Sequence, residues 1–322
     1  MNQEPAANSP EQPDVSVLIP ISDRHDDIGS IFNAHQEILA KLGLNYEFIF
    51  VLDGQFSEAE NDLKNLQKAH RESVKVIRFN RIRGEAAALT AAFSRSSGNL
   101  LLTLPAYFQV QPSEIEKLFA AMTDDRDAII ASRFPRGDNW VNRMQGRLFH
   151  KIISWLVKES FHDIACGVRL LRRAVMKRIS LYGDLHRFIP LLAIQKGFRV
   201  VEIPLAQASE DYHLRVYRLG VYWRRLLDIL TVFFLIKFTH KPLRFFGLIG
   251  SVLGASGLLI TAITVYQRVF QRMGLAERPL FLIGVLLCLV GLQTFFIGLV
   301  GEIIIFTHMP SEPGYNIEDI IE

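Results

Sequence analysis

The chain has 322 residues, 49% of them apolar, and a net charge of +3 at pH 7. Its mean hydropathy of +0.19 is high for a soluble enzyme and low for a transporter with many membrane spans. The length suits one large domain with an attachment, or two domains. The two cysteines, Cys166 and Cys288, lie in stretches of opposite character. We therefore expect no disulfide, as is usual in a reducing cytoplasm.

Residues 1–13 are polar and rich in Pro, which is typical of a disordered tail. Short apolar runs then alternate with amphipathic stretches. The apolar runs predict strands at 15–21, 46–52, 74–79, 99–104 and 128–132. The helical spacing of apolar residues predicts helices at 28–42, 58–70, 84–94 and 113–122. Ser113, with Glu116 three residues later, predicts a capping box at the last of these helices.

This alternation of strands and helices predicts parallel pairing with right-handed crossovers. Sheets of this kind bind ligands beyond the carboxyl ends of their strands. In this chain those ends fall at 20–23, 53–54, 80–84 and 104–107. We therefore expect an α/β domain over 14–213, with a ligand site at that edge of its sheet.

Two stretches near the C-terminus, 245–266 and 280–301, contain no Lys, Arg, Asp or Glu. Each has about 22 residues, enough for a helix to cross a bilayer core about 30 Å thick. Only a short connection joins them. We expect a transmembrane hairpin of two helices over 245–306, followed by a cytoplasmic tail at 307–322.

The segment 214–244, which precedes the hairpin, carries an excess of basic residues. They are Arg215, Arg218, Arg224, Arg225, Lys237, Lys241 and Arg244, against the single acid Asp228. By the positive-inside rule, such a segment places the α/β domain in the cytoplasm. The run 226–238 is amphipathic to apolar, so we expect a helix lying on the bilayer surface, or else a helix packed on the domain. A bacterial inner membrane is the expected location.

Several segments of the chain occur in a recognisable order. An Asp-Gly pair at Asp53 follows the second strand, and 163–169 reads DIACGVR. Further on, 186–190 reads HRFIP and 241–247 reads KPLRFFG. Over 14–306 the chain resembles the family-2 glycosyltransferases, most closely the polyprenyl-phosphate sugar transferases that include dolichyl-phosphate mannose synthase. The resemblance implies a nucleotide-sugar transferase fold of the GT-A type, with a mixed, mainly parallel sheet, an interfacial helix and a transmembrane hairpin.

The chain departs from this family where the family binds a metal. Its Asp-Ala-Asp motif is Pro105, Ala106 and Tyr107 here, and its Asp-Asp-Gly-Ser motif is LDGQ at 52–55. Mg²⁺ and Mn²⁺ prefer carboxylate oxygens, which Pro and Tyr do not offer. We therefore expect no metal cofactor of this motif. Cationic side chains that could offset the charge of a diphosphate lie near these positions, namely Arg24, Arg81 and Arg83.

The resemblance and the strand ends together give the candidate site. We expect Asp163 and Arg169 to be catalytic, holding the acceptor phosphate and the donor sugar in line. The expected donor-binding residues are Pro20, Asp23, Asp53, Arg81, Arg83, Gly84, Tyr107 and Gln109. The expected acceptor-binding residues are Arg133, His186, Arg215 and Tyr217. Structural roles are the alternatives: a turn at Asp53, and for Asp163 a helix cap or a salt bridge to Arg169.

These observations predict a membrane-anchored, inverting glycosyltransferase. It would move a sugar from a nucleotide diphosphate sugar to a polyprenyl phosphate or a related lipid. The expected partners are these two substrates, the membrane and a second copy of the chain, and no nucleic acid. Two alternatives remain open. One is a degenerate transferase that serves as a membrane binding or scaffold subunit, and the other is a transferase that acts on a different lipid acceptor.

Overall fold

The structure is a computed structural model that describes residues 12–22, 24–54, 56–135, 161–181, 183, 185–211, 242–271 and 279–307. The chain divides into two units. Among the described residues, the first unit holds those up to 211 and the second holds those from 242 onward. The predicted surface helix at 226–238 lies outside the described residues.

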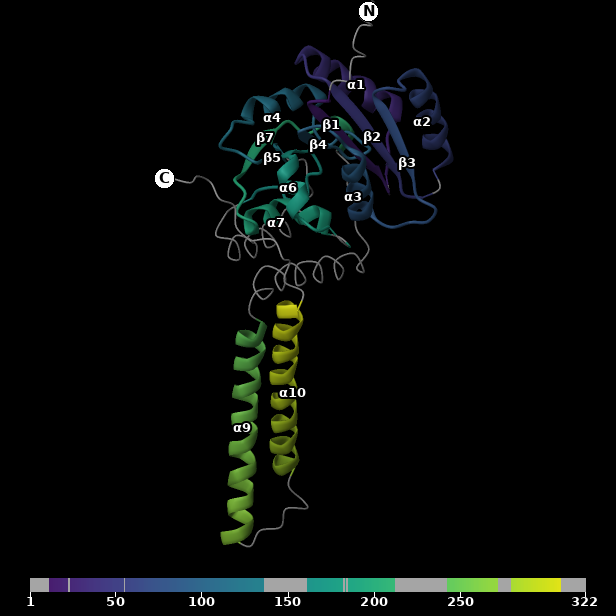
Figure 1. Cartoon of the computed structure of the whole chain (residues 1–322). Coiled ribbons are helices and arrows are strands. Elements are labelled where there is room, and N and C mark those ends of the chain that lie inside the picture. The colour runs from purple at the N-terminus through teal and green to yellow at the C-terminus, as the bar shows by residue number, and fades with distance from the viewer. Residues whose placement is uncertain are drawn as a thin grey trace, which may run out of the picture. The chain divides into compact units, whose positions relative to one another are not determined.

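The first unit is built on a seven-stranded sheet with the strand order β3-β2-β1-β4-β6-β5-β7 (Figure 1). Strand β6 runs antiparallel to both of its neighbours, and every other pairing is parallel. This confirms the predicted mixed, mainly parallel sheet. The strands are β1 (Val15–Ile21), β2 (Tyr46–Leu52), β3 (Val74–Arg78), β4 (Leu100–Thr103), β5 (Ala128–Arg133), β6 (Arg169–Arg172) and β7 (Val200–Leu205).

Helices cover both faces of this sheet, because its strands are apolar on both sides. One face packs against α1 (Ile28–Lys41), α2 (Ser57–Ala69) and α4 (Ile115–Ala121). The other face packs against α3 (Glu85–Arg95), α6 (Arg173–Arg178) and α7 (Ile189–Gln195). The result is a three-layer core in which β1 and β2 are buried along nearly their whole length.

The five predicted strands and four predicted helices are all present, with ends within two residues of those expected, and only the start of the fourth helix differs in its capping. There a 3-10 turn, η1 (Pro112–Glu114), precedes α4. The N-cap residue of α4 is Glu114, and its side chain makes no capping hydrogen bond. The predicted capping box is therefore wrong, because Ser113 lies inside the 3-10 turn rather than at the helix start. Strands β6 and β7 were not predicted.

The second unit contains two long helices, α9 (Pro242–Gln271) and α10 (Pro279–Thr307), which pack side by side (Figure 1). Both are long and apolar enough to cross a membrane, with mean hydropathies of 2.0 and 2.6. Only 17% and 11% of their most apolar windows are buried, so they do not have the burial of core helices in a soluble domain. The predicted two-helix hairpin is confirmed.

Glycines allow these two helices to approach closely. A Cβ on Gly257 would lie 2.5 Å from the backbone nitrogen of Cys288, and one on Gly250 would lie 2.6 Å from the carbonyl oxygen of Gly291. Such distances leave no room for a side chain, which is the packing expected of small residues between membrane helices. By contrast, a Cβ on Gly254 would meet nothing within 4 Å.

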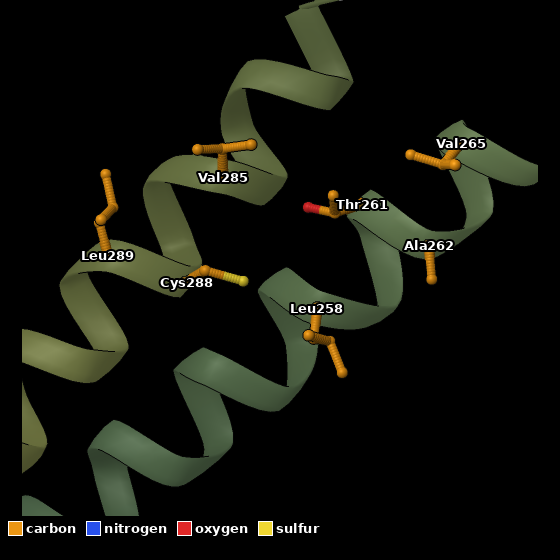
Figure 2. Close-up of a pocket in the computed structure, with 7 residues that line it drawn as sticks. All are labelled: Leu258, Thr261, Ala262, Val265, Val285, Cys288 and Leu289. Carbon is orange, nitrogen blue, oxygen red and sulfur yellow. The ribbon is translucent and has the colours of Figure 1, made fainter. Parts of the chain in front are cut away.

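Side chains of both helices line an apolar groove of about 430 Å³. Its lining residues are Leu258, Thr261, Ala262 and Val265 from α9, with Val285, Cys288 and Leu289 from α10. Figure 2 shows the side chains of Thr261 and Cys288 directed into the space between the helices. At the other end of the pair, Glu302 of α10 accepts a hydrogen bond of 3.3 Å from the backbone N–H of Leu243. A carboxylate is favourable at that place, because it satisfies a free N–H in the first turn of α9.

Candidate functional site

The sheet topology brings the charged candidates to one edge. Strands β1, β2, β3 and β4 are parallel and end there, and Thr103 at the end of β4 pairs with Arg169. Because β6 is antiparallel, it begins at the edge where the parallel strands end, so Arg169 lies at the ligand edge. Arg133 ends β5 at the same edge, opposite Leu205 of β7.

Asp53 directly follows β2 and is fully buried. Its two carboxylate oxygens accept hydrogen bonds from the backbone N–H groups of Arg83 (2.6 Å) and Gly84 (2.7 Å). Gly84 has φ of +90°, a conformation that favours glycine, and no atom lies within 4 Å of where its Cβ would stand. Asp53 thus fixes the turn before α3, on which Arg81 and Arg83 are exposed.

Tyr107 is the residue that the resemblance sets against a metal-binding carboxylate of the family. Its hydroxyl accepts a hydrogen bond of 2.7 Å from Gln109 Nε2, and the guanidinium of Arg24 lies over its ring, 4.4 Å from the centroid. Burial is the main reason that the pKa of Tyr107 is raised, and the Asp211 and Glu85 carboxylates act in the same direction. The phenol is therefore protonated at neutral pH.

These residues do not fit the metal of that motif, since a neutral phenol beside a guanidinium replaces the carboxylates. Gln109 is also committed, because its Oε1 accepts the backbone N–H of Gly167 at 2.7 Å. Within the described part of the chain, no group of three or more His, Cys, Asp or Glu side chains could hold a metal ion. Both oxygens of Asp53 accept backbone N–H groups, so this carboxylate serves the turn before α3.

Arg133 and Asp163 form a buried ion pair. Arg133 donates to the Asp163 carboxylate from Nε (2.6 Å) and Nη2 (3.0 Å), and the two side chains are 10% and 2% exposed. The remaining Nη1 donates to Asp211 at 2.9 Å. Asp163 itself is held by Glu202, which accepts the Asp163 backbone N–H at 2.7 Å. The alternative of a salt bridge between Asp163 and Arg169 is wrong, because Arg133 takes that place at the end of β5.

Arg169 lies in a second polar cluster with His186 and Glu85. Its Nη1 donates to the backbone carbonyl of His186 at 2.8 Å, and His186 Nε2 lies 3.2 Å from Glu85 Oε2. Arg169 and His186 are 2% and 5% exposed. Within the described residues, Arg169 Nε and His186 Nδ1 are buried without a hydrogen-bond partner. Burial lowers the pKa of the Arg169 guanidinium.

Cys166 is fully buried, and its thiol lies 3.5 Å from Gln109 Oε1. Burial raises the pKa of its thiol to about 11, and the nearby Asp163 carboxylate acts in the same direction. Since the thiolate is the nucleophilic form of cysteine, this thiol is inert at neutral pH.

The remaining candidates are placed as follows. Pro20 is buried inside β1, opposite Val51 of β2. Asp23, Arg215 and Tyr217 lie outside the described residues. Three carboxylates of the site were not among the predicted residues: Glu85, Asp211 and Glu202. The sequence did indicate Glu85, because it follows Gly84 at the start of the Ala-rich helix. No sequence pattern indicated Asp211 or Glu202.

Comparisons with known proteins bear on both fold and family. The model of the family described as glycosyl transferase family 2 matches residues 16–180, just over half of the chain. The structure of mannosyl-3-phosphoglycerate synthase from Rubrobacter xylanophilus is similar with a TM-score of 0.53 and 15% identity. The similarity covers 69% of this chain and 73% of that one. The first unit thus has the fold of that transferase, as the resemblance to GT-A enzymes implied.

Two other solved structures match with lower scores. Glucosyl-3-phosphoglycerate synthase from Mycobacterium tuberculosis, solved with phosphoglyceric acid, gives a TM-score of 0.48 and 14% identity over 69% of this chain and 79% of that one. The mannosyltransferase PcManGT from Pyrobaculum calidifontis, solved with GDP-Man and Mn²⁺, gives a TM-score of 0.42 and 12% identity over 95% of this chain and 78% of that one.

Proposed function

The chain belongs to glycosyl transferase family 2, and on that premise we propose that it transfers a sugar from a nucleotide diphosphate sugar to a polyprenyl phosphate or a related lipid phosphate. The reaction takes place at a membrane surface, to which the helices α9 and α10 anchor the enzyme. Their apolar, largely exposed side chains support this anchoring. We further propose that the α/β domain lies in the cytoplasm.

The observation that carries the proposal is the arrangement of Arg133 between Asp163 and Asp211. The bidentate pair with Asp163 fixes the plane of the guanidinium, and Nη1 bonds to the Asp211 carboxylate. A phosphate oxygen is also an anionic acceptor, and guanidinium groups bind phosphates well. We propose that the acceptor phosphate takes the place of Asp211 on Nη1, which makes Asp163 a positioning residue that acts through Arg133.

The donor lies across the ends of β1 to β4 in this proposal. Its diphosphate carries about two negative charges that must be offset as the sugar leaves. Arg24, which lies over the Tyr107 ring, and the exposed Arg81 and Arg83 supply positive charge near that position. Their guanidinium groups take over the role that a metal has in the family, because they can bind phosphate oxygens in a bidentate way.

The chemistry needs no strong base. A phosphate monoester has a second pKa near 6, so the acceptor is largely a dianion at pH 7. One phosphate oxygen attacks the anomeric carbon of the sugar while the bond to the nucleotide diphosphate breaks on the opposite side. This single displacement inverts the anomeric configuration. The contribution of the protein is to hold both reactants in line, a positioning effect that can be very large.

One observation favours a second candidate, a non-catalytic subunit that binds lipid or a partner. The Tyr107 ring, its bond from Gln109 and the Arg24 guanidinium fill the position where the family binds its metal. In that case the fold is retained and transfer is lost. Donor binding without transfer would support this second candidate.

The acceptor class is tested with the full chain in nanodiscs and a panel of nucleotide sugars. Undecaprenyl phosphate, undecaprenol and diacylglycerol are offered as acceptors in parallel reactions. We expect a glycolipid from undecaprenyl phosphate alone, because only this acceptor carries the anion for Arg133. An Arg133→Gln variant should then need at least about 10-fold more acceptor for half-maximal rate, since a charge-assisted hydrogen bond contributes about 1.5–3 kcal/mol. Sugar transfer to undecaprenol at the same rate would contradict the lipid-phosphate assignment.

A further inference from the structure

Glu85 is the accessible member of the cluster that also contains His186 and Arg169. It is the first residue of α3, directly after the turn held by Asp53. Its side chain is 36% exposed, whereas that of His186 is 7% exposed and Arg169 is 2% exposed. Next to it, Gly84 has open space where a side chain would project. A ligand at this edge of the sheet can therefore reach the Glu85 carboxylate but not the two groups behind it.

The groups behind Glu85 are costly for the fold. Arg169 Nε and His186 Nδ1 are buried without a hydrogen-bond partner among the described residues, and a buried polar atom left unpaired destabilises the fold. His186 Nε2 nevertheless lies 3.2 Å from Glu85 Oε2. The positive charge of Arg169 also stabilises the ionised form of Glu85. This arrangement holds one carboxylate at the edge of the site, at a cost that stability alone does not explain.

The carboxylate is ionised at neutral pH. Burial by itself would raise the pKa of Glu85, but the hydrogen bond from His186 and the charges of His186, Arg169 and Arg187 bring it below its ordinary value. An ionised carboxylate only accepts hydrogen bonds. It repels phosphate oxygens and binds groups that carry O–H or N–H. The part of a nucleotide sugar that offers several O–H groups beyond the diphosphate is its sugar ring.

We propose that Glu85, supported by His186 and Arg169, binds hydroxyl groups of the sugar being transferred and so selects the donor sugar. The inference rests on the proposed function, because it assumes that a nucleotide sugar occupies this edge of the sheet. It assigns the diphosphate to the arginines and the sugar to Glu85. A donor with a carboxylate on its sugar ring is therefore disfavoured.

The test separates the sugar from the nucleotide. Binding of UDP-glucose and GDP-mannose, and of UDP and GDP without a sugar, is measured by calorimetry on the full chain in detergent. The variants are Glu85→Ala and the isosteric Glu85→Gln. The control is Glu37→Gln on α1, which removes an exposed carboxylate paired with Lys41. Thermal midpoints are recorded for all four proteins, so that a folding defect is seen directly.

We expect Glu85→Ala to weaken binding of the preferred nucleotide sugar by about 10- to 100-fold, the range for a hydrogen bond to a charged group. The affinity for the matching nucleotide diphosphate should stay within about twofold, and Glu85→Gln should fall between Glu85→Ala and the parent chain. Equal weakening for sugar and diphosphate, or no weakening in either variant, would overturn the inference.

The outcome also distinguishes this inference from the proposed function. If the parent chain binds a nucleotide sugar in a Glu85-dependent way but transfers no sugar to any lipid, the proposed reaction fails and the sugar site stands. If transfer occurs but is independent of Glu85, only this inference fails. If the parent binds neither these compounds nor any other nucleotide sugar of the panel used for transfer, both fail.

Discussion

Replacing Asp163 by Asn is the most informative single substitution in the site. The carboxylate is 2% exposed and accepts hydrogen bonds from Arg133 Nε at 2.6 Å and Nη2 at 3.0 Å. Asn keeps the shape but loses the charge, and its NH₂ group would face a guanidinium donor. Breaking a buried ion pair by removing one partner costs about 3–5 kcal/mol. Asn retains part of the hydrogen bonding, and Asp211 still pairs with Arg133, so we expect the lower end of that range.

For a domain of about 200 residues, a loss of about 3 kcal/mol lowers the thermal midpoint by roughly 6–12 °C. Sugar transfer should fall by about 100-fold, because Arg133 is no longer held in the plane that the acceptor phosphate needs. The midpoint is followed by differential scanning fluorimetry. Transfer is measured about 15 °C below the variant's midpoint, so that the unfolded fraction stays small.

A matched control separates lost stability from lost function. Glu47 is 3% exposed and accepts hydrogen bonds from Ser16 Oγ (2.7 Å), Ser97 N (2.6 Å) and Lys75 Nζ (2.5 Å). It is the second residue of β2, far along the strand from the carboxyl edge. Glu47→Gln should lower the midpoint by a similar amount and leave transfer unchanged. If Asp163→Asn also transfers sugar at the parent rate, the ion pair is only structural and the assignment of Asp163 to the site is wrong.

Three further predictions concern stability, the hairpin and topology. Burial opposes it, but hydrogen bonds keep the pKa of Glu47 below its ordinary value of 4.5. The contribution of Glu47 to stability is therefore present above about pH 4.5 and is lost as the pH falls through the lowered pKa. In that window the unfolding free energy of Glu47→Gln, measured by urea titration, should depend less on pH than that of the parent chain. Gly257→Ala should destabilise the α9–α10 pair by about 1–3 kcal/mol through overpacking, whereas Gly254→Ala should be neutral, and equal effects in steric-trapping unfolding experiments would refute the packing argument. A cysteine introduced at Leu275 should react only with reagent outside the cytoplasm and one at 312–322 only with reagent inside it, and the reverse pattern would refute the proposed topology.

The first five strands and the hairpin could be predicted because their signals are local. Buried parallel strands are continuous apolar runs, and a membrane helix is a long stretch without charge. Strand β6 (Arg169–Arg172) reads RLLR, and two of its four residues are charged. It joins the sheet only because Leu170 and Leu171 fill the core on its two faces, which is a tertiary effect. Local patterns do not reveal such a strand.

The partners within the site were harder to predict than its members. Asp163, Arg169, Arg133 and His186 were all expected at the site, and a salt bridge from Asp163 to Arg169 was one of two structural alternatives, next to a helix cap. In the structure Asp163 pairs with Arg133 at the end of β5, while Arg169 donates to the backbone carbonyl of His186. Such pairings join residues far apart in the chain, so spacing within a motif does not determine them.

The central claim is that this enzyme transfers a sugar to a lipid phosphate with arginines in place of the metal of its family. The most direct measurement follows a radiolabelled sugar from a panel of nucleotide sugars into undecaprenyl phosphate, using the full chain in nanodiscs with and without EDTA. We expect a glycolipid that forms with inversion of the anomeric centre, and a rate that EDTA leaves largely unchanged. A rate that EDTA abolishes and Mn²⁺ restores would contradict the claim, as would the absence of glycolipid with every donor.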